Sequence, residues 1–157
     1  MVFKAIYEEV FRIDNTIVND SSLENIINSF NITREEITDI LDMLENESLI
    51  KQTKFLGNQL PMVQATYSGT LRYAENFISD FPTIYRNLIA LIINNDFSYA
   101  EVYASKLNHN KVLIEALLES FNIKGFVRTH NSLSHGITVF DITAIGRRYF
   151  SEQLANG

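Results

Sequence analysis

Residues 110–136, NKVLIEALLESFNIKGFVRTHNSLSHG, combine three sequence patterns in succession. The first part places Ile114, Leu117, Leu118 and Phe121 at the i, i+3, i+4, i+7 spacing of one buried helix face. A strand-like Phe-Val-Arg follows, then a polar Asn-Ser-Leu-Ser-His-Gly turn, then a second strand-like run, Ile-Thr-Val-Phe-Asp-Ile. The stretch therefore predicts a helix that leads into a β-hairpin.

The same pattern occurs earlier in the chain, at residues 33–59, and the two copies align without a gap at an offset of 77 residues. A capping box beginning at Ser21 matches one beginning at Ser98. Thr66-Tyr-Ser-Gly matches Thr143-Ala-Ile-Gly. Because caps, core positions, strands and turns agree in one register, we interpret the chain as a tandem duplication.

Each copy is expected to contain a first helix, a short second helix, a third helix, a hairpin and a closing helix. In the first copy the predicted helices cover residues 2–12, 21–30 and 68–79, with another opening at a capping box on Thr33; the strands cover 16–18, 49–55 and 62–66, with a tight tip at 57–59. The second copy begins with a helix over 83–94. The predicted fold class is mainly α with small antiparallel β-hairpins (α+β), in two domains, 1–80 and 81–157.

Composition narrows the class of protein. With 46% apolar and 20% charged residues among 157, the chain can bury a core. The chain has 0 Cys, which excludes a disulfide scaffold and thiolate metal sites. Its 3 His do not share a helix face, so no metal or cofactor is expected. The sequence has neither a membrane-length apolar run nor a signal peptide's basic start, which predicts a cytoplasmic protein without a membrane partner.

Charge is unevenly distributed along the chain. The net charge is −6. Residues 1–80 hold 6 basic and 13 acidic residues, which gives −7, whereas residues 81–157 hold 7 basic and 6 acidic residues, which gives +1. A nucleic-acid binder usually carries a basic patch, so any such patch must lie in the second half.

The predicted order of elements resembles the winged helix–turn–helix domain, in two copies that cover nearly the whole chain. Residues 44–51, LENESLIK, are similar to the helix-to-wing junction of winged-helix regulators, and residues 141–149, DITAIGRRY, resemble the strand that leads into their last helix. The resemblance implies a DNA-binding protein that places the third helix in the major groove and the wing on the phosphate backbone. If the protein is a transcription regulator, it is expected to be a dimer.

The third helix of the first copy does not suit that role. Its positions outside the predicted core are Glu35, Glu36, Asp39, Asp42 and Glu45. Five carboxylates facing phosphates would be repelled. We interpret them as a solvated acidic face or as a docking face for a basic partner.

Basic and polar residues of the second copy are the candidates for nucleic-acid binding. They surround its third helix: Lys106, His109, Asn110, Lys111, Arg128, His130, His135, Arg147 and Arg148. A helix N-terminus flanked by lysine, together with arginine on a wing, fits a phosphate clamp. A scattered solvated surface is the alternative.

Val112, Leu113 and Ala116 widen the apolar stripe of the same helix beyond the needs of one small core. Such residues can contact thymine methyl groups. More often, a widened stripe is covered by another domain or subunit, so these three residues are the candidates for protein interaction.

No enzyme signature is present: the chain lacks a glycine-rich phosphate loop, a serine nucleophile elbow, an HExxH motif and a Cys–His pair. Two functional hypotheses follow. The first is a non-catalytic DNA-binding regulator that contacts DNA mainly through the second copy. The second is an acidic protein-interaction module, with a protein partner or a second copy of the chain; it resembles the tandem winged-helix subunits that bind the linker subunit of condensin-type complexes.

Overall fold

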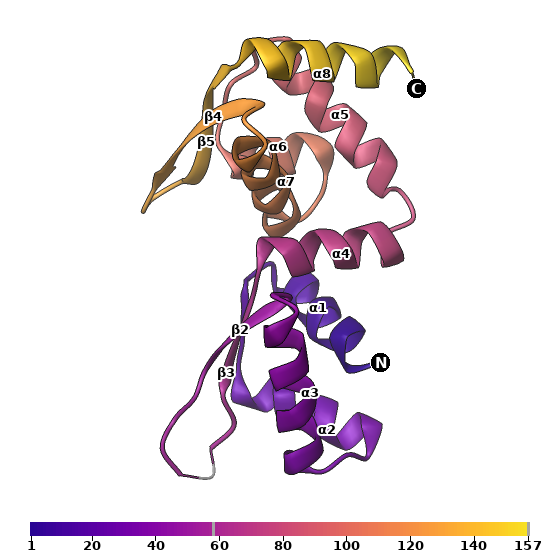
Figure 1. Ribbon diagram of the computed structural model, residues 1–157, viewed down its shortest axis with the longest axis vertical. Helices are drawn as coiled ribbons and strands as arrows, with labels where there is room; N and C mark the ends of the chain where they lie inside the picture. Colours follow the sequence, from indigo (N-terminus) through magenta and orange to yellow (C-terminus); the bar gives the residue numbers. More distant parts are fainter. Residues whose placement is uncertain (58, 157) are drawn as a thin grey trace. The chain divides into compact units, whose positions relative to one another are not determined.

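The computed structural model describes residues 1–57 and 59–156, and it is mainly helical with small antiparallel sheets, as the fold class predicts (Figure 1). Contacts divide the chain into unit 1, Met1–Tyr73, and unit 2, Ala74–Gly157. The division lies within helix α4 (Tyr67–Phe77), whereas the predicted boundary follows residue 80. None of the described helices has the length and apolar character needed to cross a bilayer.

Unit 1 packs helices against a three-stranded sheet. Its elements are α1 (Val2–Ile13), β1 (Ile17–Val18), α2 (Asp20–Phe30), α3 (Arg34–Asn46), β2 (Ile50–Thr53), β3 (Met62–Ala65) and the first part of α4. The strands are antiparallel in the order β1-β3-β2. Ile6, Tyr7 and Val10 on one face of α1 are buried, at the spacing of an amphipathic helix. Asn58, in the predicted tip of the β2–β3 hairpin, lies outside the described residues.

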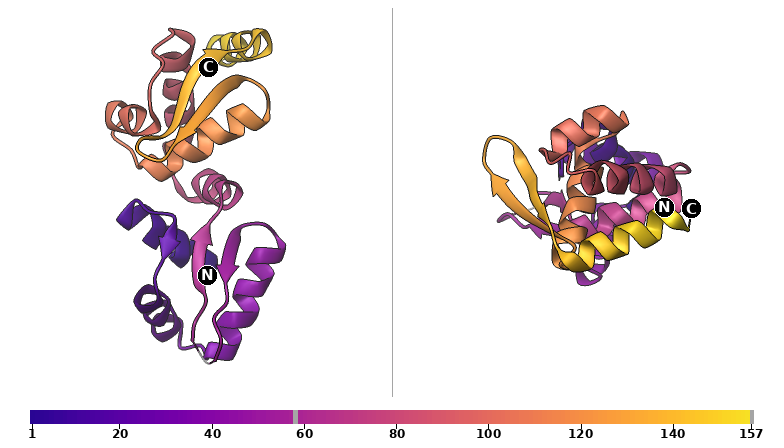
Figure 2. Two further views of the ribbon diagram at one scale, coloured as in Figure 1. Left: turned by 90° about the vertical axis from the view of Figure 1, so that its left-hand side faces the viewer. Right: turned by 90° about the horizontal axis from the view of Figure 1, so that it is seen from above.

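Unit 2 has a smaller sheet. Its elements are the rest of α4, then α5 (Phe81–Ile93), α6 (Ala100–Leu107), α7 (Lys111–Ile123), β4 (Val127–Ser132), β5 (Gly136–Ile142) and α8 (Ala144–Ala155). β4 and β5 form an antiparallel pair, and an isolated bridge between Tyr99 and Thr138 ties the start of α6 to β5. In Figure 2 this hairpin is the longest extended feature of the unit.

The elements recur at the offset of 77 residues. Helices α3 and α7 begin and end at matching positions, β2 matches the start of β4, and α4 and α8 begin together. Backbone turns recur as well. Asn31 and Asn108 end the second helix of each unit with φ of 52° and 54°, and Ser48 and Gly125 precede each hairpin with φ of 60° and 72°.

The most detailed correspondence is the junction between hairpin and closing helix. In unit 1 the Thr66 hydroxyl donates to the carbonyl oxygen of Leu49 at 2.9 Å, and its oxygen accepts from the amide of Gly69 at 3.0 Å. A Cβ on Gly69 would overlap the Leu49 carbonyl and the Tyr7 hydroxyl. Only glycine therefore allows α4 to begin so close to the hairpin.

Unit 2 repeats this junction with matched residues. The Thr143 hydroxyl donates to the carbonyl oxygen of Gly125 at 2.6 Å and lies 3.2 Å from that of Phe126, and the amide of Gly146 donates back at 3.0 Å. A Cβ on Gly146 would overlap the Phe126 carbonyl. The Thr-x-x-Gly sequence therefore serves one geometric purpose in both units.

Of the three capping boxes predicted from the sequence, at Ser21, Thr33 and Ser98, the structure has the one at Thr33. The Thr33 capping box is confirmed: the Glu36 amide donates to the Thr33 hydroxyl at 3.1 Å, and the Thr33 amide donates to the Glu36 carboxylate at 2.7 Å. The predicted cap at Ser21 is wrong. Asn19 caps α2, because its side-chain oxygen accepts from the Ser22 amide at 2.9 Å and starts the helix earlier.

The predicted capping box at Ser98 is also wrong. The N-cap of α6 is Tyr99, which makes no side-chain cap hydrogen bond. The carbonyl of Ser98 instead accepts from the Val139 amide at 3.2 Å, since this residue adjoins the bridge to β5. A tertiary backbone contact has replaced the local cap.

Candidate functional site

The β4–β5 hairpin of unit 2 folds onto α7. Glycine occupies position 136, at the tip-proximal end of β5, with φ of 70°. A Cβ on Gly136 would overlap the Glu115 carboxylate and lie 3.5 Å from Cε of Lys111. The ring of His135 stacks on Tyr99, with ring centroids 4.5 Å apart. The hairpin tip is thus held against the N-terminal half of α7 and the start of α6.

Most of the cations predicted to bind nucleic acid pair with carboxylates of their own unit. The pairs are Lys106 with Asp96, His109 with Asp80, Lys111 with Glu115, Arg128 with Asp141, and Arg148 with Glu152. Four of these are ion pairs of Lys or Arg with a carboxylate. The fifth, between His109 and Asp80, is an ion pair only when His109 is protonated. These pairs cancel the local positive charge that a phosphate clamp needs.

The remaining polar candidates are arranged differently. Arg147 donates to the side-chain oxygen of Asn95 at 3.4 Å, a neutral partner. His130 is exposed on β4, and its ring makes no hydrogen bond or ion pair with any residue in the described ranges. Asn110 is the N-cap of α7 but provides no side-chain cap. Arg147, His130 and His135, whose ring stacks on Tyr99, are therefore the cationic candidates without a carboxylate partner in the described part of the chain.

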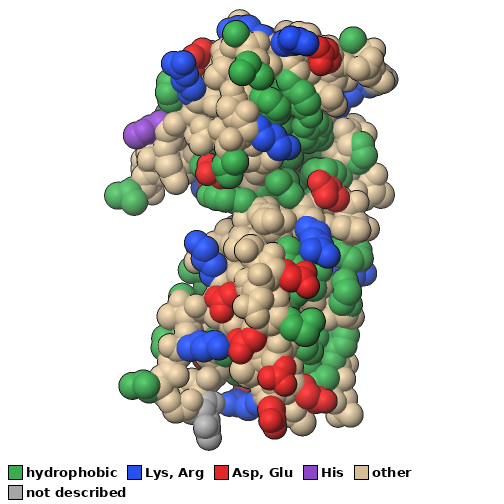
Figure 3. Space-filling model, viewed as in Figure 1, with side chains coloured by type: hydrophobic (Ala, Val, Ile, Leu, Met, Phe, Trp, Pro, Cys, Tyr) green, Lys and Arg blue, Asp and Glu red, His purple; other side chains and the backbone are tan. Residues whose placement is uncertain are grey.

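These candidates also lie at two ends of one helix. Lys111 and His135 lie at the N-terminal end of α7, where the hairpin tip contacts it. Arg128 and Arg147 lie at the other end, because β4 starts just after α7 and Gly146 touches Phe126. The 13 residues of α7 span about 20 Å. On the face in Figure 3 the Lys and Arg side chains of unit 2 are dispersed, some of them next to acidic side chains, and they form no single patch.

The three residues predicted to bind a protein, Val112, Leu113 and Ala116, are buried, with at most 4% of their surface exposed. By helical spacing Val112 and Ala116 lie on the side of α7 opposite Phe121, which belongs to the core. Contact with bases or with a partner would require this face to be uncovered. As an interaction surface these residues stay a prediction.

Helix α3 of unit 1 presents the opposite character. The acidic side chains of this unit gather over α3 in Figure 3. Asp42 accepts from Lys54 Nζ and from Gln52 Nε2, each at 2.8 Å, and these bonds, that from Lys54 first, lower the pKa of its carboxyl. Glu45 accepts from the Gln52 amide at 2.7 Å. The hairpin therefore supplies a cation to Asp42 and neutral hydrogen-bond donors to Glu45.

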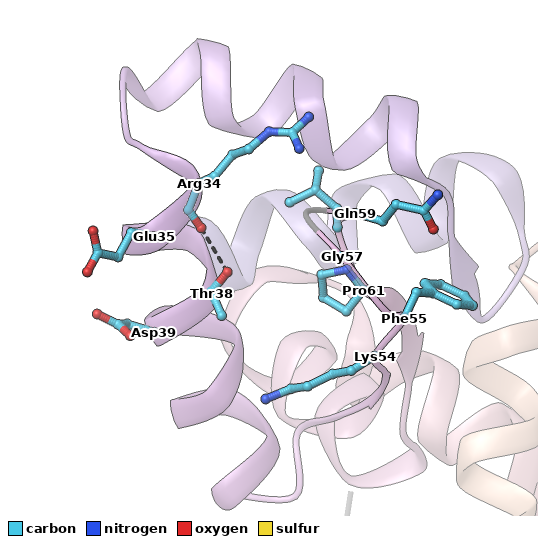
Figure 4. Close-up of a pocket in the computed structure, with 10 residues that line it drawn as sticks. Arg34, Glu35, Thr38, Asp39, Lys54, Phe55, Gly57, Gln59 and Pro61 are labelled. Atoms are coloured by element: carbon cyan, nitrogen blue, oxygen red, sulfur yellow. Dashed lines mark hydrogen bonds between the residues drawn. The ribbon is translucent and has the colours of Figure 1, made fainter.

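Glu35 and Asp39, one helical turn apart, are exposed on the same helix. Within residues 1–57 and 59–156, neither carboxylate has a hydrogen bond or an ion pair. In Figure 4 both side chains extend outward from α3, on the side away from the hairpin, and both residues line the outer edge of a groove. Among the described residues Asp42 is the carboxylate of α3 that pairs with a cation, whereas Glu36 and Glu45 have neutral hydrogen-bond partners.

That groove lies between α3 and the tip of the β2–β3 hairpin and has a volume of about 590 Å³ (Figure 4). Leu60 and Pro61 are the buried part of its lining, and Phe55 forms an apolar wall that is 48% exposed. The two cations at its edge are engaged: Arg34 pairs with Glu24, and Lys54 pairs with Asp42. The groove therefore combines apolar walls with two free carboxylates.

The sequence signals for this groove are weak. The acidic residues of α3 are visible in the sequence, but the contribution of Phe55, Leu60 and Pro61 is not predicted. The one available signal is the pair Phe55-Leu56, two large apolar residues in an otherwise polar turn. Leu56 is 98% exposed.

Among the described residues, no three His, Cys, Asp or Glu side chains gather as a metal site requires. Comparison with known proteins adds no family: no protein-family model and no curated protein matches the sequence.

Proposed function

We propose that the chain is a tandem winged-helix protein that acts as a non-catalytic docking module for a protein partner. The order helix, short helix, third helix, hairpin and closing helix, present twice at an offset of 77 residues, supports the winged-helix assignment. Fold alone does not decide between nucleic acid and protein as the partner.

The surface of the third helix in each unit supports a protein partner rather than DNA. In a winged helix the third helix enters the major groove. Here that helix exposes two free carboxylates, Glu35 and Asp39, in unit 1, and its apolar face is buried in unit 2. Carboxylates facing phosphates are repelled, and a buried face cannot touch a base edge.

The charge balance of unit 2 agrees with this choice. Five arginines and lysines are candidates for the clamp, and four of them pair with Asp96, Glu115, Asp141 and Glu152. Exposed ion pairs contribute only about 0–1 kcal/mol each, so a phosphate could displace a carboxylate. The displaced carboxylate would nevertheless remain beside the phosphate and oppose binding.

DNA binding through unit 2 is the second candidate. It is favoured by Arg147, whose guanidinium bonds the neutral Asn95, and by its neighbour Arg148 at the start of α8. Two cations at one helix start would make a small phosphate contact, far short of the several contacts in a specific complex.

A titration of labelled duplex DNA with the full chain, followed by fluorescence polarisation, separates the two functions. We expect no saturable binding at about 150 mM salt. DNA-binding proteins with several phosphate contacts bind more tightly as salt falls to about 50 mM. Saturable binding that weakens steeply with salt, and that is lost in the K111E/R128E/R147E variant, would overturn the docking function.

The positive test is a complex with a protein. The full chain is used to capture proteins from its source cells, and each recovered protein is then purified and mixed with the chain. We expect one of them to form a stoichiometric complex by size-exclusion chromatography with light scattering. A chain that binds duplex DNA and forms no such protein complex contradicts the proposal.

A further inference from the structure

We infer that the groove between α3 and the β2–β3 hairpin of unit 1 binds a basic segment of the partner protein in which Lys or Arg alternates with apolar residues. This inference rests on the proposed docking function and names the chemistry of its partner. The groove is formed by unit 1 alone. Its described lining comes from one face of α3 and from the hairpin: Arg34, Glu35, Thr38, Asp39, Lys54, Phe55, Gly57, Gln59, Leu60 and Pro61.

Charge complementarity selects a cation. Glu35 and Asp39 lie one turn apart on the rim, without a partner in the described part of the chain. The nearby cations Arg34 and Lys54 already pair with Glu24 and Asp42. The free charge at the rim is therefore negative, which attracts Lys or Arg and repels phosphate, carboxylate and anionic lipid.

The apolar lining selects the flanking residues. Phe55 is half exposed, and the buried Leu60 and Pro61 make the interior of the groove apolar. The neighbouring Leu56 is almost wholly exposed at the hairpin tip. An apolar side chain placed between cationic ones would cover Phe55 while its neighbours reach the rim carboxylates.

The size of the groove limits the occupant. At about 590 Å³ it lies within the range of about 300–1,000 Å³ typical of pockets for small ligands. It can accept a few side chains of an extended segment but cannot enclose a helix about 10 Å wide. The occupant is therefore a short linear segment.

Unit 2 provides an internal control. At the offset of 77 residues, Glu35 and Asp39 correspond to Val112 and Ala116, which are buried. Gln59, on the hairpin side of the groove, corresponds to Gly136, which lies against Glu115. The same two elements thus close on each other in unit 2, so an open acidic groove is a property of unit 1 and not of the fold.

The two hairpin tips carry the same exposed apolar residue, Leu56 in unit 1 and Leu133 in unit 2. The identical pairs at this offset are Ser21/Ser98, Glu24/Glu101, Asn31/Asn108, Ile37/Ile114, Leu41/Leu118, Leu56/Leu133, Thr66/Thr143, Gly69/Gly146 and Glu75/Glu152. Three of the pairs are large and apolar. Two of these are buried core residues, whereas Leu56 and Leu133 are exposed. An apolar tip kept in both copies without a packing role fits a contact made with a partner.

The test uses three short fluorescein-labelled peptides and the full chain. In the first peptide arginine alternates with leucine, in the second arginine alternates with glycine, and in the third glutamate alternates with leucine. We expect saturable binding of the first peptide, weaker binding of the second and none of the third. Amide resonances of Thr38, Phe55 and Gln59 should shift in ¹⁵N-correlated spectra as the first peptide is added.

Matched variants locate the site. E35Q/D39N should weaken binding of the arginine–leucine peptide about tenfold, since two exposed ion pairs are lost. The control E75Q/E101Q removes the same charge from exposed positions outside the groove, one of them also in a first helical turn, and should leave affinity unchanged. Preserved amide spectra show that both variants fold.

Several results would overturn the groove assignment: equal binding by E35Q/D39N and wild type, equal binding of the glycine and leucine peptides, or shifts confined to unit 2. Such a result leaves the docking function standing if the purified partner still forms its complex. If no protein complex forms and DNA binds, the docking function itself fails. The two failures are therefore distinguishable.

Discussion

The same pair of elements is open in unit 1 and closed in unit 2. In unit 1, Gln59 and Thr38 line a groove between the hairpin and α3. Their counterparts in unit 2, Gly136 and Glu115, lie so close that a Cβ on the glycine would overlap the carboxylate. One side-chain difference on the hairpin thus accompanies a change from an accessible groove to an internal contact.

The comparison shows which parts of a duplicated fold are constrained. The Thr-x-x-Gly junction, the left-handed turns and the buried face of the third helix recur, because each satisfies backbone groups or fills the core. The outer face of the third helix carries no such requirement. It is acidic and exposed in unit 1 and apolar and buried in unit 2.

The largest expected effect is on the shared junction. Gly69→Ala or Gly146→Ala places a Cβ against a backbone carbonyl that cannot move aside, so each should destabilise its own unit by about 3 kcal/mol. Hydrogen exchange of the full chain measures this unit by unit. Gly57→Ala, at a glycine whose added Cβ meets nothing within 4 Å, controls for the change of residue type, although its φ of 90° adds local strain.

A loss of protection in both units after either junction substitution would contradict the view that each junction stabilises its own unit. Equal protection in the variants and wild type would show that the helix start shifts without cost.

A smaller effect is expected at the closed hairpin. Gly136→Ala must hold alanine at a φ of 70° and displace the Glu115 carboxylate, which should cost about 1–2 kcal/mol. The matched Gln59→Ala, on the open side, should cost less than about 0.5 kcal/mol. Chemical denaturation compares the two variants; equal costs would mean that the hairpin–α7 contact contributes nothing to stability.

Acid should act more strongly on unit 1. Its Glu9 carboxylate accepts from Arg12 at 2.6 Å and from Ser22 at 2.6 Å, and these bonds, that from Arg12 first, lower the pKa of Glu9 from 4.5 to about 2. A carboxyl with a lowered folded pKa adds stability above pH 4.5, which is lost as the pH falls toward 2.

Glu9→Gln should therefore remove about 1 kcal/mol near neutral pH, a figure kept low because Arg12 is largely exposed. Helix α5, the first whole helix of unit 2, contains no Asp or Glu and so adds no such carboxyl titration. Unfolding followed from pH 7 to pH 3 should show the variant and wild type converge as the acid limit is approached. A constant difference at every pH would refute the role of Glu9.

The smallest effect on stability is expected at the two tips. Leu56→Ser and Leu133→Ser alter exposed side chains, so each should change the free energy of unfolding by less than about 0.5 kcal/mol. Any loss of partner binding would then report a direct contact. If Leu56→Ser weakens the partner complex and Leu133→Ser does not, the functional contact belongs to unit 1; a large loss of stability from either change would contradict the exposure of the tips.

Local patterns predict much of this fold. The buried face of α7 and the Thr33 capping box follow from residue spacing alone, because both involve neighbours within two helical turns. The Ser21 and Ser98 caps fail for different reasons. Asn19 is a competing cap two residues earlier, and the backbone of Ser98 bonds to Val139 in a distant strand.

The candidate site is less accessible from the sequence. The partners that neutralise His109 and Arg128, Asp80 and Asp141, are distant along the chain, and periodicity does not pair them. The groove likewise needs α3 and the hairpin together. The acidic part of its lining can be predicted from the sequence because it falls on one helix. Phe55 and Pro61 cannot be predicted as lining residues, because they meet α3 only after the hairpin folds back.

The ion pairs of unit 2 also bear on how fast partners arrive. A cation held beside its own carboxylate acts at a distance as a dipole, and over a Debye length of about 8 Å its field is largely lost. Encounters with unit 2 should therefore proceed at unsteered rates that ionic strength hardly alters. Approach to the unpaired Glu35 and Asp39 of unit 1 is different: a basic partner would be drawn in faster at low salt, so the salt dependence of the association rate reports which unit is met first.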